Sequence, residues 1–107
     1  MDLSVIPNET VRSAVAALQK NDKNTWFSYF AKDIVFTDDG NTLNFKSFFE
    51  NAFAKKEKFL QIERIENNGK DIYGVFYAGQ WGTFKVYFKF QLNDEEKIIR
   101  LDIGQIR

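Results

Sequence analysis

The chain has 107 residues, of which 44% are hydrophobic, and its fifteen basic and fifteen acidic side chains cancel. A chain of this length forms one domain, here residues 1–107, and its interspersed charges create no field that would attract nucleic acid or anionic lipid. Because Cys and His are absent, disulfides, soft metal sites and a histidine general base are excluded, which leaves only an oxygen-ligand metal site possible. We expect neither a metal nor a cofactor.

The sequence before and beyond the first expected helix predicts neither a targeting segment nor a membrane segment. Residues 1–7 have neither the basic start nor the apolar length of a signal peptide, and no other segment is long and apolar enough for a membrane span. We therefore expect a cytoplasmic protein with no membrane partner.

Asn8 can cap a helix that runs from Glu9 to about Asn21. One apolar stripe with helical spacing supports this helix: Val11, Ala14, Val15 and Leu18.

A second, shorter helix is predicted after Asp22 or Asn24, either of which can cap it. Trp26, Phe27 and Phe30 would share one face of this helix, with Tyr29 at its edge. Trp26 is large enough to anchor the core, and it could instead form one wall of a ligand pocket.

Residues 33–40, Asp-Ile-Val-Phe-Thr-Asp-Asp-Gly, are expected to form a short strand that ends in a turn. Side chains alternate between the two faces of a strand. If Ile34 and Phe36 face the core, Asp38 therefore faces inward as well.

Residues 42–45 could pair as a second short strand, after which Asn44 or Ser47 begins a third helix. The apolar side of this helix is expected to contain Phe48, Phe49, Ala52 and Phe53. Three helical segments thus precede the part of the chain that alternates as strands do.

The clearest strand lies within residues 82–93, where an apolar side chain falls at every second position: Phe84, Val86, Phe88, Phe90 and Leu92. Other strands are expected at residues 59–66, with a bulge, at 71–78 and at 97–106. Three helical segments followed by a four-stranded meander predict an α+β fold.

Residues 22–53 resemble the NTF2-like superfamily, in particular its SnoaL-like and ketosteroid-isomerase-like members. The resemblance is carried by Asp22 between the two helices, residues 29–38, Gly40, and the Phe48-Phe49 pair of the third helix. The order of elements over the whole chain agrees. The resemblance implies an NTF2-like cone, in which three N-terminal helices pack in a strongly curved, mostly antiparallel sheet around a pocket.

The resemblance also implies a role for Asp38. Steroid isomerases of this family use an aspartate at the end of the first strand as general base, and Asp38 stands at that position. Among Phe36 and other rings its carboxylate would be desolvated, which raises its pKa and suits proton abstraction from carbon. The family's hydrogen-bond donors fall at Ala14 and Phe88, which cannot donate, so steroid isomerisation is disfavoured. Residues 38–40 are also an ordinary turn sequence.

Three hypotheses for function follow. In the first, the cone binds a small apolar molecule without catalysis, in a pocket lined by Trp26, Tyr29, Phe36, Asp38, Trp81 and Phe88. In the second, the protein is an isomerase, cyclase or dehydratase with Asp38 as general base. In the third, its own phenylalanines fill the cone, and the protein is a structural dimerisation module.

A homodimer is expected through the outer face of the sheet. The expected contact surface contains Tyr73, Tyr77, Lys85, Tyr87 and Lys89, which would form an aromatic patch flanked by lysines. In one alternative, these tyrosines lie on a sheet face that is exposed to solvent and makes no contact. Another turns Tyr73 and Tyr77 inward as hydrogen-bond donors in the pocket.

Overall fold

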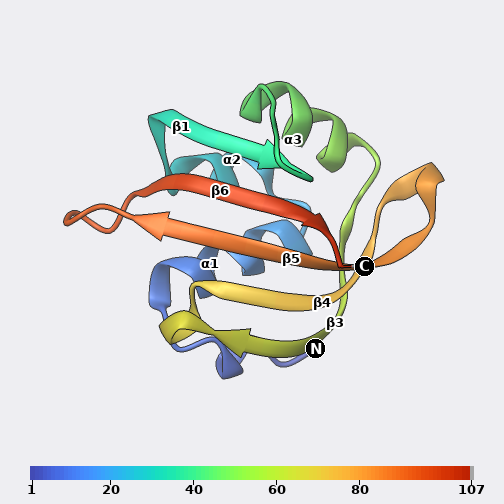
Figure 1. The fold of residues 1–107 in the computed structure, drawn as a ribbon, viewed down its shortest axis with the longest axis horizontal. Helices are drawn as coiled ribbons and strands as arrows, with labels where there is room; N and C mark the ends of the chain where they lie inside the picture. The colour runs from blue at the N-terminus through green and yellow to red at the C-terminus, as the bar shows by residue number, and fades with distance from the viewer. Residues whose placement is uncertain (107) are drawn as a thin grey trace.

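The predicted α+β architecture is present in the computed structural model, which describes residues 1–106. Over these residues three α-helices pack against one face of a six-stranded sheet (Figure 1). The elements are, in order, η1 (Leu3–Val5), α1 (Glu9–Gln19), α2 (Lys23–Ser28), β1 (Phe30–Asp38), β2 (Asn41–Thr42), α3 (Phe45–Ala54), β3 (Lys58–Glu66), η2 (Asn67–Gly69), β4 (Asp71–Tyr77), η3 (Gly79–Trp81), β5 (Thr83–Leu92) and β6 (Ile98–Gln105). Within the described range, no helix has the length and apolarity that a membrane crossing requires.

Each α-helix begins after a capping residue that the sequence indicates. The side chains of Asn8, Asp22 and Asn44 each accept a hydrogen bond from the backbone N–H three residues later. Phe30, which was expected on the second helix, is instead the first residue of β1. The reason is that the backbone carbonyl of Tyr29 accepts a hydrogen bond from β6, which draws the chain into the sheet.

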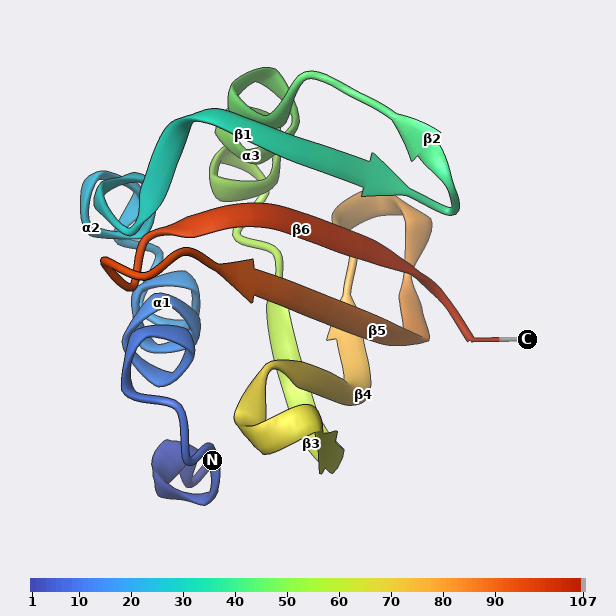
Figure 2. The same cartoon turned by 60° about the vertical axis from the view of Figure 1, so that its left-hand side comes forward.

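The strand order in the sheet is β2-β1-β6-β5-β4-β3. Only the β1–β6 pair is parallel among the described strands, so the sheet is mostly antiparallel, as predicted. The expected bulge in β3 is present, because its register with β4 shifts between Phe59 and Gln61 and again between Ile62 and Arg64. Such bulges bend a strand. In Figure 2, β3 and β4 accordingly turn away from the plane of β1, β6 and β5.

The core at the α2 end of the cone is filled by aromatic rings. Trp26 is completely buried, and its ring centroid lies 4.7 Å from that of Phe30 and 4.8 Å from that of Phe49. Phe45 and Phe53 complete the ring cluster around it. Its indole Nε1 is buried without a hydrogen-bond partner. Trp26 is therefore a core anchor.

Candidate functional site

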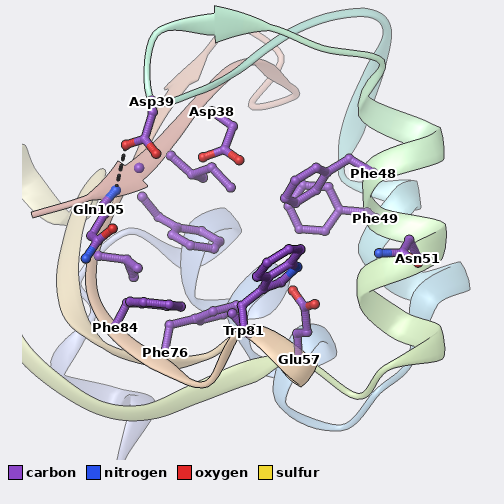
Figure 3. A pocket seen from close by; sticks show the side chains of 15 residues that line it. Asp38, Asp39, Phe48, Phe49, Asn51, Glu57, Phe76, Trp81, Phe84 and Gln105 are labelled. Carbon is purple, nitrogen blue, oxygen red and sulfur yellow. Dashed lines mark hydrogen bonds between the residues drawn. The ribbon is translucent and has the colours of Figure 1, made fainter.

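A cavity of about 330 Å³ opens at the other end of the cone, where β1 ends and η3 connects β4 to β5 (Figure 3). Its walls are largely apolar and include the rings of Phe48, Phe49, Phe76, Phe84 and Phe88. Its polar groups belong to Asp38, Asp39, Asn51, Glu57 and Gln105. The phenylalanines thus leave part of the cone open, whereas a purely structural module requires them to fill it.

Three of the six residues proposed from the sequence to contact a ligand line this cavity. Asp38 enters from the end of β1, and Phe88 points inward from the middle of β5. Trp81 lies in η3 at the rim, where 70% of its surface is exposed although its side chain lines the cavity. These three residues come from three separate elements.

The other three lie elsewhere, which corrects their expected placement. Trp26 and Tyr29 belong to the α2 end, where Trp26 is enclosed by rings and Tyr29 lies half-buried against the core. Phe36 is buried beneath α3, with its ring 4.9 Å from that of Phe48 and 5.4 Å from that of Phe49. Because these two α3 rings cover Phe36, they line the cavity in its place.

The inward direction of Asp38 follows from the pairing of β1 with β6. Asp38 lies opposite Ile103, a buried residue of the inner face, so both side chains point into the cone. The turn beyond it is fixed by Asp39, whose carboxylate accepts a hydrogen bond of 2.9 Å from the backbone N–H of Gln105. Asp39 adopts a φ of 50°, a left-handed conformation that Asp tolerates better than most residues. This turn therefore holds Asp38 at the cavity.

Glu57 is a cavity residue that the sequence interpretation missed. After α3 the chain reverses in a Schellman motif, in which the N–H groups of Lys56 and Glu57 donate to the carbonyls of Phe53 and Ala52. This reversal turns Glu57 inward, and only 7% of its surface remains exposed. The motif usually carries Gly at the left-handed position, but here Lys56 occupies it with a φ of 57°. Because no glycine marks the reversal, the segment that contains Lys55, Lys56 and Lys58 has the sequence pattern of a solvated helix end.

Burial shifts the acidity of both cavity carboxyls. Desolvation raises the pKa of Asp38, and the negative charge of Asp39 raises it further. Desolvation also raises the pKa of Glu57; Lys55 opposes this change, while the charge of Asp38 adds to it. No residue between 1 and 106 donates a hydrogen bond to either carboxyl, and no Lys or Arg nitrogen lies within ion-pair distance.

Comparisons with known proteins report on the fold. Neither protein-family models nor curated protein sequences gave a match to the chain. Among solved structures, an uncharacterised cystatin-fold protein from Novosphingobium aromaticivorans is 21% identical, with a TM-score of 0.73 over 92% of this chain and 96% of its own. A candidate polyketide cyclase from Sinorhizobium meliloti is 17% identical, with a TM-score of 0.73 over 96% of this chain and 99% of its own.

An NTF2-like protein of unknown function from Cytophaga hutchinsonii is 13% identical, with a TM-score of 0.71 over 92% of this chain and 88% of its own. This chain has the NTF2-like fold. The fold resemblance inferred from residues 22–53 is thus confirmed over nearly the whole chain, and the cavity is the interior of an NTF2-like cone.

The five residues expected at a dimer contact lie on the outer face of this NTF2-like cone. Ile72 and Phe76 of β4 are buried on the inner face, so Tyr73 and Tyr77 point outward. This corrects the alternative in which both tyrosines serve as pocket donors. In the neighbouring strand, Tyr87 pairs with Tyr73 and has the same outward direction. The lysines at positions 85 and 89 flank it on that face.

The pKa shifts predict that the cavity acids lower stability at neutral pH. An acid whose pKa is higher in the folded than in the unfolded protein favours folding at low pH, and this contribution is lost as the pH rises through the folded pKa. We expect Glu57→Gln to increase the free energy of unfolding near pH 7 by roughly 1 kcal/mol, or to raise Tm by about 4–8 °C. The increase should shrink as the pH falls toward the ordinary glutamate pKa of 4.5.

Thermal unfolding followed by circular dichroism across this pH range measures the effect. Glu66→Gln, which removes an exposed carboxylate at the end of β3, is the matched control and should change Tm little at any pH. A Glu57→Gln protein that melts below the unmodified protein near pH 7 would contradict the prediction.

Proposed function

We propose that the protein binds a small, largely apolar molecule in the cavity of its NTF2-like cone. The observation that carries this proposal is the open cavity of about 330 Å³ between α3 and the sheet, with walls that are mainly phenylalanine rings. Ligand pockets have volumes of roughly 300–1,000 Å³, with apolar walls and a few placed polar groups. Burying apolar ligand surface there contributes roughly 25 cal/mol per Å². The cytoplasmic location expected from the sequence belongs to the same proposal.

A second candidate function is proton abstraction by Asp38, and it is favoured by one observation. Asp38 points into an apolar cavity, and burial raises its pKa, as a general base near neutral pH requires. The resembled isomerases' donor positions hold Ala14 and Phe88, so any hydrogen bond to a developing oxyanion must come from other groups. Asn51 and Gln105 line the cavity and carry amide N–H donors. The fold shared with a candidate polyketide cyclase supports a carbon-acid substrate.

We also propose that two copies associate through the outer sheet face, where the patch of Tyr73, Tyr77, Lys85, Tyr87 and Lys89 lies. Tyr77 is 37% exposed and is the most accessible large ring of this patch. Tyr87 packs across the cross-strand Gly104, where no space remains for a Cβ. An aromatic surface of this kind suits a two-fold contact between identical faces.

The binding proposal predicts that filling the cavity prevents binding. Nile red, a neutral apolar dye, should bind the unmodified protein with an increase in fluorescence. Val86→Phe places a ring inside the cavity and should weaken binding by at least about tenfold, since the apolar contact surface is lost. Val75→Phe adds the same bulk on the outer face of the paired strand and serves as the control. Equal dye affinity in the two variants would contradict the proposed site.

The second candidate predicts that the protein exchanges the α-hydrogens of a ketone. With 2-tetralone in D₂O, NMR should detect deuterium incorporation faster than in buffer, and Asp38→Asn should slow it roughly a hundredfold. Asp33→Asn, an exposed acid at the other end of β1, should leave the rate unchanged. Exchange no faster than in buffer, or equal in Asp38→Asn, would remove this candidate and leave the binding proposal intact.

The association proposal predicts a dimer in solution that Tyr77→Glu converts to a monomer, because a charge at a buried apolar contact is costly to desolvate. Size-exclusion chromatography with light scattering measures the mass. Lys20→Glu, an exposed change after α1 and away from the sheet, should leave the dimer intact. A monomeric unmodified protein, or a Tyr77→Glu protein that stays dimeric, would overturn the proposed surface.

A further inference from the structure

Three acidic residues, Asp38, Asp39 and Glu57, line the cavity, and within residues 1–106 no Lys or Arg forms an ion pair with Asp38 or Glu57. Only 7% of the surface of Glu57 is exposed, so this residue is 93% buried. Its carboxyl lines the cavity, and no described residue donates a hydrogen bond to it. Asp38 enters from the opposite wall, and its negative charge helps to raise the pKa of Glu57. Figure 3 shows both carboxyls pointing into the space that the phenylalanine rings enclose. A carboxylate that is largely withdrawn from bulk water, opens onto a cavity and has no described protein donor points to a ligand group that completes its hydrogen bonds.

A cationic group completes two carboxylates better than a neutral or anionic one. Inorganic cations such as Mg²⁺ and Ca²⁺ need about six or more oxygen ligands, and the phenylalanine walls supply none. Within residues 1–106, no group of three or more Asp, Glu, Cys or His is placed to hold a metal ion. An organic ammonium instead needs only hydrogen-bond acceptors at one end and apolar surface around its body.

The cavity rim offers a further contact for a cation. Trp81 lines the cavity from η3, close to the segment that carries Glu57: a Cβ on Gly79, two residues before Trp81, would lie 3.3 Å from the Glu57 carboxylate. Among aromatic side chains, Trp attracts cations most strongly through its ring face. Glu57 and Trp81 therefore place a negative charge and an indole at the same part of the mouth.

We propose that the ligand of this cavity is a hydrophobic organic amine, whose ammonium group lies between the Glu57 and Asp38 carboxylates while its apolar body packs on the phenylalanine walls. This inference rests on the proposed binding function and names its ligand class. The carboxylates supply charge-assisted hydrogen bonds, and the rings supply burial.

Amine binding should strengthen as the pH rises through the elevated pKa values of Asp38 and Glu57, because both must be ionised to pair with the ammonium. Three titratable groups lie near this pair. Asp39 adds negative charge behind Asp38, and Lys55 partly offsets the charge of Glu57. Tyr87 lies on the outer face of the sheet; desolvation, followed by the charges of Asp39, Asp102 and Asp38, raises its pKa, so its phenol stays neutral. Trp81 carries no charge.

Isothermal titration calorimetry with three naphthalene compounds tests the inference. These are 1-naphthylmethylamine, 1-naphthylmethanol and 1-naphthoate, which share one apolar body and differ in head-group charge. Near pH 8 the amine should bind at least about tenfold more tightly than the alcohol, and the anion should bind most weakly. The advantage of the amine over the alcohol should shrink as the pH is lowered, because protonation of the two carboxyls removes the charges that pair with the ammonium.

Glu57→Gln should reduce amine affinity at least about tenfold while changing alcohol affinity by no more than about twofold. The same variant is expected to be more stable than the unmodified protein, so loss of folding would not explain a loss of amine binding. Glu63→Gln, which removes an acid from the exposed side of β3, should leave all three affinities unchanged.

Two results would overturn the inference without touching the binding proposal. One is an alcohol that binds as tightly as the amine while Nile red still binds and Val86→Phe still weakens it. The other is a Glu57→Gln protein that keeps the full preference for the amine. If neither Nile red nor any naphthalene compound binds, the proposed function fails and the ligand class fails with it.

Discussion

The bend of β3 across β4 is the constraint on which the cone depends. Two register shifts in β3 carry the bend, and they bring the backbone of β3 against Gly74, where a Cβ would overlap the carbonyl oxygen of Gln61. Any larger residue at position 74 would push the strands apart, so the curvature requires glycine there. Because β3 and β4 turn away from the other strands, the sheet surrounds α3 only in part. The space between Phe76, Phe88 and the α3 rings is the cavity.

The two ends of the cone have different roles: one is packed and stabilises the fold, and the other contains the cavity. At the α2 end, Trp26 and its ring neighbours fill the interior as a dense protein core does, and this packing holds the helices on the sheet. At the other end a cavity remains between α3 and the sheet, and Trp81 at the rim stays mainly exposed. The filled end can therefore support an open end that contains Asp38 and Glu57, two groups whose burial opposes folding at neutral pH.

The sequence predicts the elements better than it predicts the site. Caps and alternation are local, so the helix starts, the bulge and the direction of Asp38 follow from a few neighbouring residues. Which rings face the cavity depends on how α3 lies over β1, a long-range contact that places Phe48 in front of Phe36. The direction of Glu57 depends on a left-handed Lys56, which has no glycine to signal it. Neither the position of Phe48 in front of Phe36 nor the direction of Glu57 can be predicted from the spacing of residues in the sequence.

Asp38 and Asp102 show how the fold separates a structural acid from a candidate functional one. They lie on adjacent strands but on opposite faces. Burial alone would raise the pKa of Asp102, yet hydrogen bonds from Arg100 and Thr37 together with the Arg100 charge outweigh it and lower that pKa. Asp38 has no such donors within residues 1–106, and burial raises its pKa. A fold that satisfies one aspartate on its outer face and leaves the other without a partner inside a cavity leaves room for a ligand to supply that partner.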